Sequence, residues 1–297
     1  MPPTMHIAIL SNPESWYVAD LVRAAGDRHL ITTVSFNELA SAVDSRGVGV
    51  SAGGVDLQAV DVVLVRTMPP GSLEQVVFRM DVLGRLEVSG VVVINSARAV
   101  EAAVDKYLAT AKLQAAGLLV PRTIACQTPQ DALQAYDALG GDVVVKPLFG
   151  GEGRGITRAS DEALALRAFK MLTELGAVVY LQEFVPHDGY DLRLLVIGPK
   201  VLGIRRRNPH DWRTNISRGA TAEPCEVTPE LAESAQRAAA ALGARFCGVD
   251  LLPAEDGQLY AIEVNASPGW KATAAALGID AARLLLDDLE TLVRAAT

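Results

Sequence analysis

Short apolar runs alternate with longer amphipathic segments over the first third of the chain. The runs occupy residues 6–10, 31–36, 60–65 and 91–96, and an apolar pattern of helical period occupies residues 72–88. This alternation is typical of a parallel sheet whose strands are joined by crossover helices. The pattern therefore predicts a first domain of the α/β class over residues 1–97.

Elements of both types continue after residue 98. A helix is predicted around residues 105–117, a strand near 121–126, a helix after Thr128-Pro129, and a strand at 142–149. After a glycine-rich interruption, the predicted elements are a helix at 162–175, strands at 178–185, 191–197 and 200–207, a helix at 229–242, and a closing helix at 280–295. We place one domain at residues 98–184 and another at 185–297.

The first turn of the first domain argues against a dinucleotide-binding protein. The segment LSNPES, which follows the first apolar run, contains no glycine. A pyrophosphate reaches a helix N-terminus in such domains only through a glycine-rich turn. A dehydrogenase is therefore not expected.

The segment YAIEVNASPG is a strand that carries two polar side chains toward one face. Glu263 and Asn265 are two residues apart, so they share that face, while Ile262 and Val264 point to the other. If a two-residue hairpin loop at Asp256-Gly257 sets the register, Asp250 lies opposite Glu263.

Two carboxylates so placed repel unless a cation bridges them or one takes up a proton. With the amide of Asn265 they form a set of three oxygen donors suited to Mg²⁺. Pro253 leaves a wider loop open, because it cannot donate to the ladder, and an odd shift would put Asp250 on the wrong face.

The loop GGEGRG at residues 150–155 carries four glycines and Arg154, a composition that can fold backbone N–H groups around an anion. Without a Gly-Lys-Ser/Thr ending it is not a Walker A loop, and a flexible hairpin tip is the alternative. Lys146 lies just upstream in an apolar strand. A phosphate would be a natural partner for its ammonium, and a lysine reaching from the strand end to water is the alternative.

Two further segments carry polar groups. Gln182 and Glu183 end an apolar strand, where the backbone can receive a flat ring or where the strand end is simply solvated. The segment RRRNPHDWRTNISRG holds five arginines against one aspartate. It is either an exposed basic face or a set of guanidinium groups for carboxylate and phosphate.

Composition narrows the class of partner. The chain has 297 residues, half of them hydrophobic, and a formal net charge of -8, which speaks against nucleic-acid binding over a broad face. Three widely spaced cysteines indicate neither a zinc site nor a disulfide framework. Because no apolar run reaches the length of about 18 residues that a membrane span needs, we expect a cytoplasmic protein with small-molecule partners and no membrane partner.

Six segments in order resemble motifs of the ATP-grasp superfamily and, within it, of the RimK-like glutamate ligases. They are DKYLATAKLQAAGLLVPRT, VVVKPLFGGEGRGI, LQEFV with DLRLLVIG, WRTNISRGATA, GVDLL and EVNASPG. The likeness covers about residues 80–297. It implies an α/β chain in which a Rossmann-like pre-ATP-grasp domain precedes a two-part ATP-grasp fold, with the glycine-rich lid in the first part and the metal site in the second.

The resemblance also implies roles for individual residues. The phosphate ligands would be Lys106 and Lys146, and the lid would be residues 150–155 with Gly151, Glu152, Gly153, Arg154 and Gly155. The adenine hinge would be Gln182, Glu183, Phe184 and Val185, with Asp191 reaching the ribose, and the metal ligands would be Asp250, Glu263 and Asn265. The groups near the transferred phosphate would be Arg206, Arg213, Asn215 and Arg218, with Arg193 as a neighbour.

The reaction that the resemblance implies joins a carboxylate to an amine through an acyl phosphate, with ATP and two Mg²⁺ ions, or Mn²⁺ in their place. Glutamate is expected among the substrates, and a homo-oligomer is left open. The alternatives are a ligase that adds glutamate to a pterin-type cofactor rather than to a protein tail, and a nucleotide-binding protein without turnover. Ala220 and Trp270-Lys271 depart from the family pattern where the acceptor should approach. We expect Trp270 to line the acceptor pocket, with packing in the core as the alternative.

Overall fold

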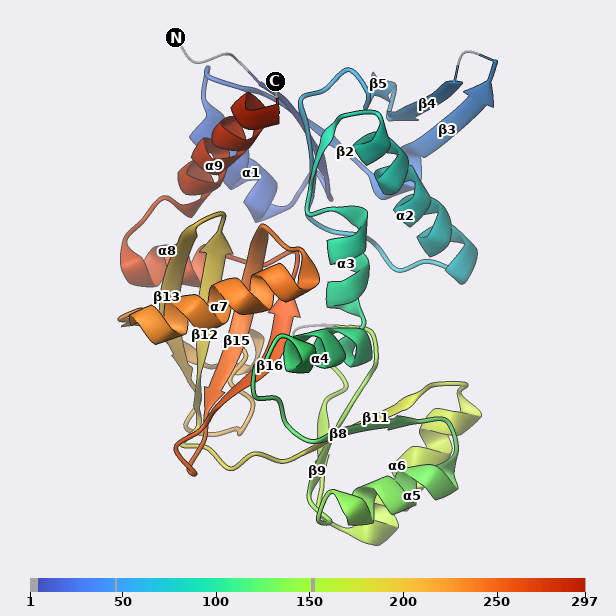
Figure 1. Ribbon diagram of the computed structural model, residues 1–297, viewed down its shortest axis with the longest axis vertical. Coiled ribbons are helices and arrows are strands. Elements are labelled where there is room, and N and C mark those ends of the chain that lie inside the picture. The colour runs from blue at the N-terminus through green and yellow to red at the C-terminus, as the bar shows by residue number, and fades with distance from the viewer. Residues whose placement is uncertain (1–4, 46, 151–152, 297) are drawn as a thin grey trace.

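Four apolar strands form a parallel sheet at the N-terminal end of the molecule. The strands β1 (His6–Leu10), β2 (Leu30–Val34), β6 (Val62–Val65) and β7 (Val92–Ile94) pair in the order β2-β1-β6-β7. Helices α1 (Trp16–Ala25) and α2 (Leu73–Val88) connect β1 to β2 and β6 to β7. The computed structural model, which describes residues 5–45, 47–150 and 153–296, thus confirms the Rossmann-like first domain (Figure 1).

The connection from β2 to β6 differs from the predicted helical crossover. A short helical turn, η1 (Phe36–Glu38), leads into an antiparallel sheet of β3 (Leu39–Asp44), β4 (Gly47–Ala52) and β5 (Val55–Asp56). Five of the six residues of β3 are exposed. Because strands are recognised in a sequence by alternating burial, a strand exposed on both faces leaves no such pattern.

A second sheet, here called the lid sheet, lies at the opposite end of the molecule (Figure 1). It consists of β8 (Thr123–Cys126), β9 (Val143–Lys146), β10 (Thr157–Ala159) and β11 (Val179–Glu183), in the order β10-β9-β11-β8. Helices α5 (Pro129–Ala138) and α6 (Glu162–Glu174) cover one face, where Val143, Val145 and Leu181 are buried. The alternate residues Lys146, Tyr180 and Gln182 therefore face the centre of the molecule.

Two helices, rather than the single predicted one, lead from the first domain to the lid sheet. α3 (Ala97–Val104) ends at Asp105, whose carboxylate accepts hydrogen bonds from the backbone N–H groups of Tyr107 and Leu108 and so caps α4 (Lys106–Ala115). The cap places Lys106 in the first turn of α4.

An antiparallel sheet, here called the central sheet, lies between these two ends. Its order is β14-β13-β12-β15-β16, from β12 (Tyr190–Ile197), β13 (Lys200–Arg207), β14 (Thr221–Cys225), β15 (Phe246–Pro253) and β16 (Leu259–Asn265). Helix α7 (Pro229–Leu242) packs on it, and η2 (Ile216–Arg218) lies between β13 and β14. The lid sheet and the central sheet form the two-part ATP-grasp fold, while the domain limits at residues 97/98 and 184/185 stay predictions.

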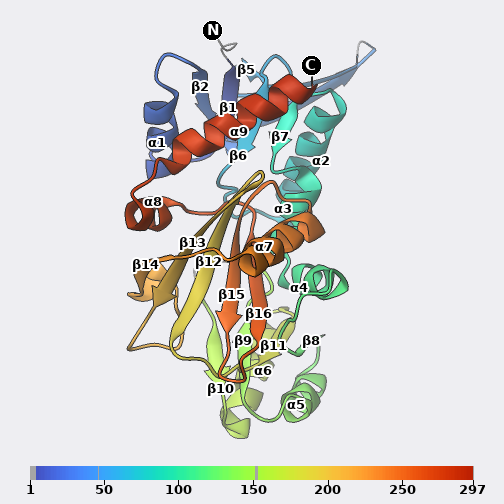
Figure 2. The ribbon, with the colours of Figure 1, turned by 60° about the vertical axis from the view of Figure 1, so that its left-hand side comes forward.

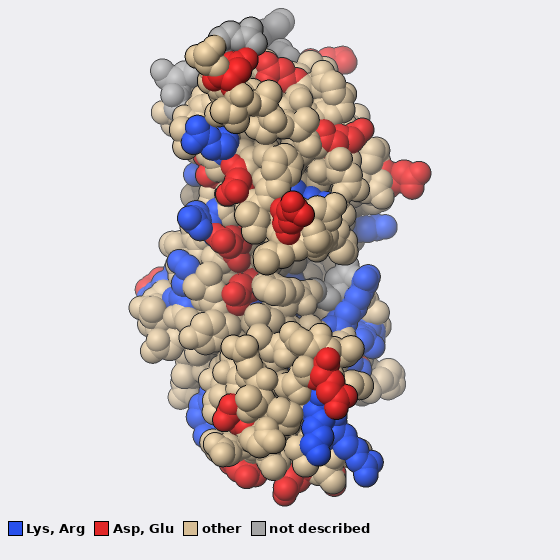
Figure 3. All heavy atoms as spheres, turned by 90° about the vertical axis from the view of Figure 1, so that its right-hand side faces the viewer, with Lys and Arg blue, Asp and Glu red and all other residues tan. Residues whose placement is uncertain are grey.

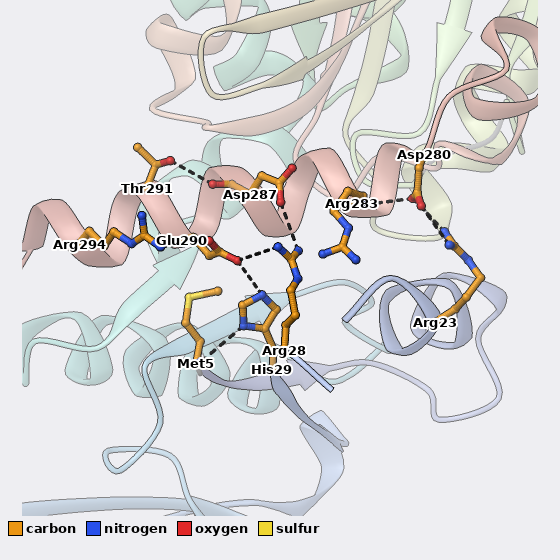
Figure 4. A network of polar contacts seen from close by, with 10 residues as sticks. All are labelled: Met5, Arg23, Arg28, His29, Asp280, Arg283, Asp287, Glu290, Thr291 and Arg294. Atoms are coloured by element: carbon orange, nitrogen blue, oxygen red, sulfur yellow. Dashed lines mark hydrogen bonds and ion pairs between the residues drawn. The ribbon is translucent and has the colours of Figure 1, made fainter. Parts of the chain in front are cut away.

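The C-terminal helices return the chain to the first domain. After α8 (Lys271–Leu277), α9 (Ala281–Ala296) runs along the N-terminal sheet beside α1 (Figure 2). Figure 4 shows polar contacts between this C-terminal segment and the first domain. Arg23 donates to Asp280 at 2.8 and 2.9 Å, and His29 Nε2 lies 2.9 Å from Glu290 Oε1. The first domain is therefore fixed to the last element of the chain.

The surface carries no obvious broad basic area on the side that Figure 3 shows. There, acidic and basic side chains stand in small groups among neutral ones, and the largest basic group follows one edge of the middle and lower parts. Within the described ranges, every helix falls short of the length and apolar character that crossing a bilayer requires.

Candidate active site

The hairpin of β15 and β16 places two acidic side chains opposite each other. Asp250 is the Cα partner of Glu263, and Gly248 is the partner of Asn265. The predicted pairing of Asp250 with Glu263 is therefore confirmed. Glu263 lines the space between the lid sheet and the central sheet, whereas Val264 is fully buried in the core.

The predicted two-residue hairpin loop is one residue shorter than the loop in the structure. Ala254 N–H donates to the carbonyl of Gln258, so the loop has three residues, with Gly257 at a φ of 80°. A register shift next to Asp250 and Leu251 compensates for the longer loop. At this bulge Ile262 lines the same pocket as Glu263, which corrects the expectation that it points to the opposite face.

The carboxylate of Asp250 is neutralised by arginines rather than left against Glu263. Arg193 Nε lies 2.5 Å from one oxygen and Arg206 Nη2 lies 3.0 Å from the other. Arg206 also binds both oxygens of Asp191, with Nε at 2.8 Å from Oδ1. Asp191, Arg206 and Asp250 are each less than a tenth exposed. A ribose hydroxyl would therefore have to share the oxygens of Asp191 with Arg206.

Burial and charge act in opposite directions on these carboxyl groups. Burial raises the pKa of Asp191, and Arg206 only partly offsets this effect. Burial also acts to raise the pKa of Asp250, but Arg193 and Arg206 together hold it below its ordinary value. Asp250 thus remains an ionised group with its charge already matched.

Glu263 differs from Asp250 because it has no hydrogen bond or ion pair with the described residues. Asn265 Oδ1 accepts a hydrogen bond from Ser267 N–H at 2.9 Å, which orients the amide next to Glu263 on the same strand. No group of three or more His, Cys, Asp and Glu side chains gathers as a metal site within the described residues. The predicted donor set of two carboxylates and one amide fits Mg²⁺ through Glu263, the carboxylate that remains free for a cation.

The two lysines lie on different elements around one cavity. Lys106 in α4 and Lys146 in β9 line it together with Glu263. Lys106 Nζ donates to the carbonyl of Gly150 at 2.6 Å, and burial lowers its pKa. Lys146 donates to Gln182 Oε1, and desolvation lowers the pKa of Lys146 to about 8. The Lys106 ammonium therefore lies at the start of the glycine-rich loop, and Lys146 lines the pocket. An anion would be favourable beside both ammonium groups.

The strand end at residues 182–185 forms one wall of the pocket. Glu183 pairs with Arg122 at 2.5 Å, and the guanidinium of Arg158 stacks on Phe184 at 3.4 Å from the ring centre. The backbone N–H groups of Glu183 and Phe184 donate to Arg122 and Asp142. Hydrogen bonds to a ring would therefore come from the remaining backbone groups of this segment.

The glycine-rich loop meets the loop between β13 and β14, residues 208–220, across the site. Arg218 Nη2 donates to the carbonyl of Gly153 at 3.2 Å, and Arg213 Nη1 donates to the carbonyl of Ile156 at 3.2 Å. A Cβ atom at Gly153, whose φ is 71°, would lie 2.6 Å from Asn215 Oδ1. Glycine at this position therefore allows the two loops to pack together. Gly151 and Glu152 lie outside the described residues.

One pocket brings most of the predicted residues together. Its lining includes Lys146, Gln182, Glu183, Phe184, Val185, Asp191, Arg206, Arg213, Asn215, Asp250 and Glu263. Lys106 lines the adjoining cavity, and the lining of the main pocket does not include Gly153, Arg154, Gly155, Arg218 or Asn265.

Sequence reasoning missed Trp212 and Thr214 of the pocket lining. Both stand inside the segment WRTN, between the residues that it did single out, and Trp212 meets Phe184 edge to face at 5.8 Å. An aromatic residue in an otherwise polar loop was the available signal.

Trp270 corrects the expectation for the acceptor. Its side chain is 1% exposed, packs against Tyr17 at 4.7 Å and Phe246 at 5.8 Å, and donates from Nε1 to Asp20 at 2.8 Å. Trp270 therefore belongs to the core between the first domain and the central sheet, because the chain bends at Ala266 and Ser267 and then passes close to Tyr17 of α1 at Gly269. Lys271 remains outside, with its ammonium 5.1 Å from the Trp16 ring centre.

The fold and this pocket define an ATP-grasp enzyme, a ligase that forms carbon–nitrogen bonds with ATP and Mg²⁺. Two family profiles match the chain: the RimK pre-ATP-grasp domain over residues 5–100 and the RimK-like ATP-grasp domain over residues 103–289. The chain belongs to the RimK-like ATP-grasp family.

Relatives match over nearly the whole chain. The tetrahydromethanopterin:alpha-L-glutamate ligase of Methanosarcina acetivorans is 31% identical over 318 aligned positions, covering 96% of this chain and 98% of the relative. A probable alpha-L-glutamate ligase of Shewanella baltica is 31% identical, with 96% and 95% covered. Among solved structures, the ATP-grasp ligase PsnB complexed with minimal precursor, Mg and ADP has a TM-score of 0.74 at 22% identity, over 97% of this chain and 98% of that one. This last likeness concerns the fold.

Proposed function

We propose that the enzyme adds glutamate to a small-molecule acceptor of the pterin type. The names of two relatives support it, since both are tetrahydromethanopterin:alpha-L-glutamate ligases, at 31% identity over 96% of this chain and at 36% identity over 71% of it. Trp270 does not line an acceptor site, because it is buried in the core. The observation that carries turnover itself is the pocket in which Lys146, Arg206, Asp250 and Glu263 converge. A binding protein without catalysis would not need this set.

The proposed reaction has two steps. A substrate carboxylate attacks the γ-phosphorus of ATP, which forms an acyl phosphate and releases ADP; the amine of the second substrate then attacks the acyl carbon and releases phosphate. Lys106 and Lys146 hold the phosphates, while Arg206, Arg213 and Arg218 surround the transferred group with positive charge. Asn215 orients the glycine-rich loop from the opposite side.

Asp250, Glu263 and Asn265 would hold two Mg²⁺ ions, which neutralise phosphate charge during transfer and which Mn²⁺ can replace. Gln182, Glu183, Phe184 and Val185 would receive the adenine and Asp191 the ribose. Gly151, Glu152, Gly153, Arg154 and Gly155 would close over the triphosphate.

A release assay for ADP tests the proposal. We expect purified protein with MgATP, glutamate and a reduced pterin acceptor to form ADP and a ligated product, identified by mass spectrometry. A glutamate-terminated peptide is the alternative acceptor. Ligation of the peptide but not of the pterin would transfer the enzyme to the protein-modifying class. If no ADP forms with either acceptor, glutamate is rejected as a substrate.

Replacement of Lys146 should weaken nucleotide binding without much effect on folding. Lys146→Ala removes an ammonium that meets phosphate and no core volume. We expect the Kd for ADP to rise by about tenfold to a hundredfold, the value of a hydrogen bond to a charged group. In the wild type the ammonium is present below its pKa of about 8 and is lost above it. Affinity should therefore be constant below that pH and fall as the pH rises through it.

Calorimetric titration with ADP and Mg²⁺ from pH 6.5 to 9.5 measures both effects. Lys112→Ala, on the exposed side of α4, is the matched control. If Lys146→Ala binds ADP like the wild type, the Lys146 ammonium has no phosphate to bind and, among the described residues, interacts with Gln182 alone.

A further inference from the structure

A tyrosine in the middle of the lid sheet lines the cavity that Lys106 and Lys146 share. Tyr180 of β11 is the Cα partner of Lys146 in β9, and Gln182 is the partner of Thr123 in β8. Alternation along the strands puts these side chains on the face away from α5 and α6. Tyr180 is 1% exposed, and it also lines the cavity shared by Lys106, Lys146 and Glu263.

The hydroxyl of Tyr180 joins its own strand, β11, to α4. It lies 2.8 Å from Thr110 Oγ1 in α4 and accepts a hydrogen bond from Gln182 Nε2 at 3.0 Å. It also lies 3.4 Å from the backbone carbonyl oxygen of Lys106. Gln182 Oε1 in turn accepts from the ammonium of Lys146.

These contacts fix the direction of the Gln182 amide. Its Nε2 has two acceptors, Tyr180 Oη and Thr123 Oγ1, each at 3.0 Å. The Thr123 hydroxyl donates its proton to the carbonyl of Pro121, so it must accept from Gln182. A flipped amide would turn its NH₂ group toward the ammonium of Lys146, which has only donors. The carbonyl oxygen is therefore held toward Lys146.

We propose that Tyr180 is a positioning residue that sets Lys106 and Lys146 at a fixed spacing for the nucleotide phosphates. The inference rests on the proposed role of the two lysines in ATP binding. Lys106 belongs to the first turn of α4 and Lys146 to the end of β9, so neither element alone determines their distance. Through Thr110 the hydroxyl holds α4, and through Gln182 it holds the Lys146 ammonium. The site is thereby organised before the nucleotide arrives, which reduces the entropy that binding costs.

Tyr180→Phe removes only the hydroxyl and leaves the ring in place. We expect the Kd for ADP with Mg²⁺ to rise about fivefold to tenfold, because the hydroxyl contacts that hold the two lysines are lost. Tyr136→Phe is the matched control, because Tyr136 is also buried in the lid, at 5% exposure, but packs with the helices on the other face of the sheet. Its variant should bind ADP like the wild type. Equal affinities for all three proteins would overturn the proposal.

A double-mutant cycle separates positioning from packing. Thr110→Val should weaken ADP binding to about the same extent as Tyr180→Phe, and the double variant should be no weaker than either one, since all three break one network. Thr110→Ser, which keeps the hydroxyl, should restore the wild-type Kd. Additive losses, or a lower melting temperature with unchanged Kd, would show that Tyr180 only packs. If the wild type itself binds no ADP, the nucleotide assignment of the pocket fails first, and the variants are then not at issue.

Discussion

Glu263→Gln is expected to reduce the rate of ADP formation by on the order of a hundredfold or more while the fold and stability are kept. The amide has the same shape as the carboxylate, but it carries no charge to balance a cation. Of the two carboxylates that face each other on the hairpin, Glu263 has no ion pair with the described arginines, whereas Asp250 is already neutralised. The charge that draws the metal into the pocket would therefore be lost with this one substitution.

The measurement is initial velocity against Mg²⁺ concentration, together with thermal unfolding of the same sample. Glu255→Gln, at the exposed tip of the same hairpin, is the control and should behave like the wild type. Partial recovery at high Mg²⁺ would agree with a weakened ion site. Full activity of Glu263→Gln at low Mg²⁺ would remove Glu263 from the metal ligands.

The hairpin illustrates why part of the site could be predicted from the sequence. The loop proved one residue longer than expected, and the bulge beside Asp250 shifted the register back by one residue. Asp250 and Glu263 therefore face each other as predicted, although the loop that was assumed is absent. Alternation along a strand is a strong constraint, because a single uncompensated slip would put a carboxylate into the core.

The neutralisation of Asp250 could not be predicted in the same way. Arg193 and Arg206 approach from β12 and β13, and the order of strands in the central sheet determines that they meet Asp250. The hairpin alone suggested repulsion between two acids, and this holds only if no other cation is near. A neighbour from a distant strand has no local signal in the sequence.

Trp270 is a residue whose location was predicted incorrectly from its local sequence. Its position after the strand of the predicted metal ligands suggested the acceptor pocket, but the chain bends at Ala266 and Ser267 and the indole packs beside Tyr17 of α1. Tyr17 and Asp20, which both contact the indole, lie about 250 residues earlier in the chain. The antiparallel sheet at residues 39–56 escaped prediction for another reason, since the exposed strand β3 lacks an apolar face.

Arg206→Met is expected to lower the free energy of unfolding by roughly 3–5 kcal/mol at pH 8, the usual cost of removing one partner from a buried ion pair. Asp191 would lose its arginine while it stays buried, and Asp250 would keep only Arg193. Burial already raises the pKa of Asp191, and without Arg206 it should rise further. A carboxyl group whose pKa is raised on folding destabilises the fold above that pKa and ceases to do so when protonated. The loss should therefore be smaller at pH 5.5 than at pH 8.

Urea unfolding at the two pH values measures this difference. Arg207→Met is the control, because Arg207 points to the other face of β13 and stacks on Tyr190 at 5.1 Å. Adding Asp191→Asn to Arg206→Met removes the uncompensated charge and should recover part of the stability, though not the activity. An equal loss at both pH values, or no recovery in the double variant, would mean that Arg206 stabilises the sheet by packing and that its charge is not needed to hold Asp191 and Asp250 in the pocket.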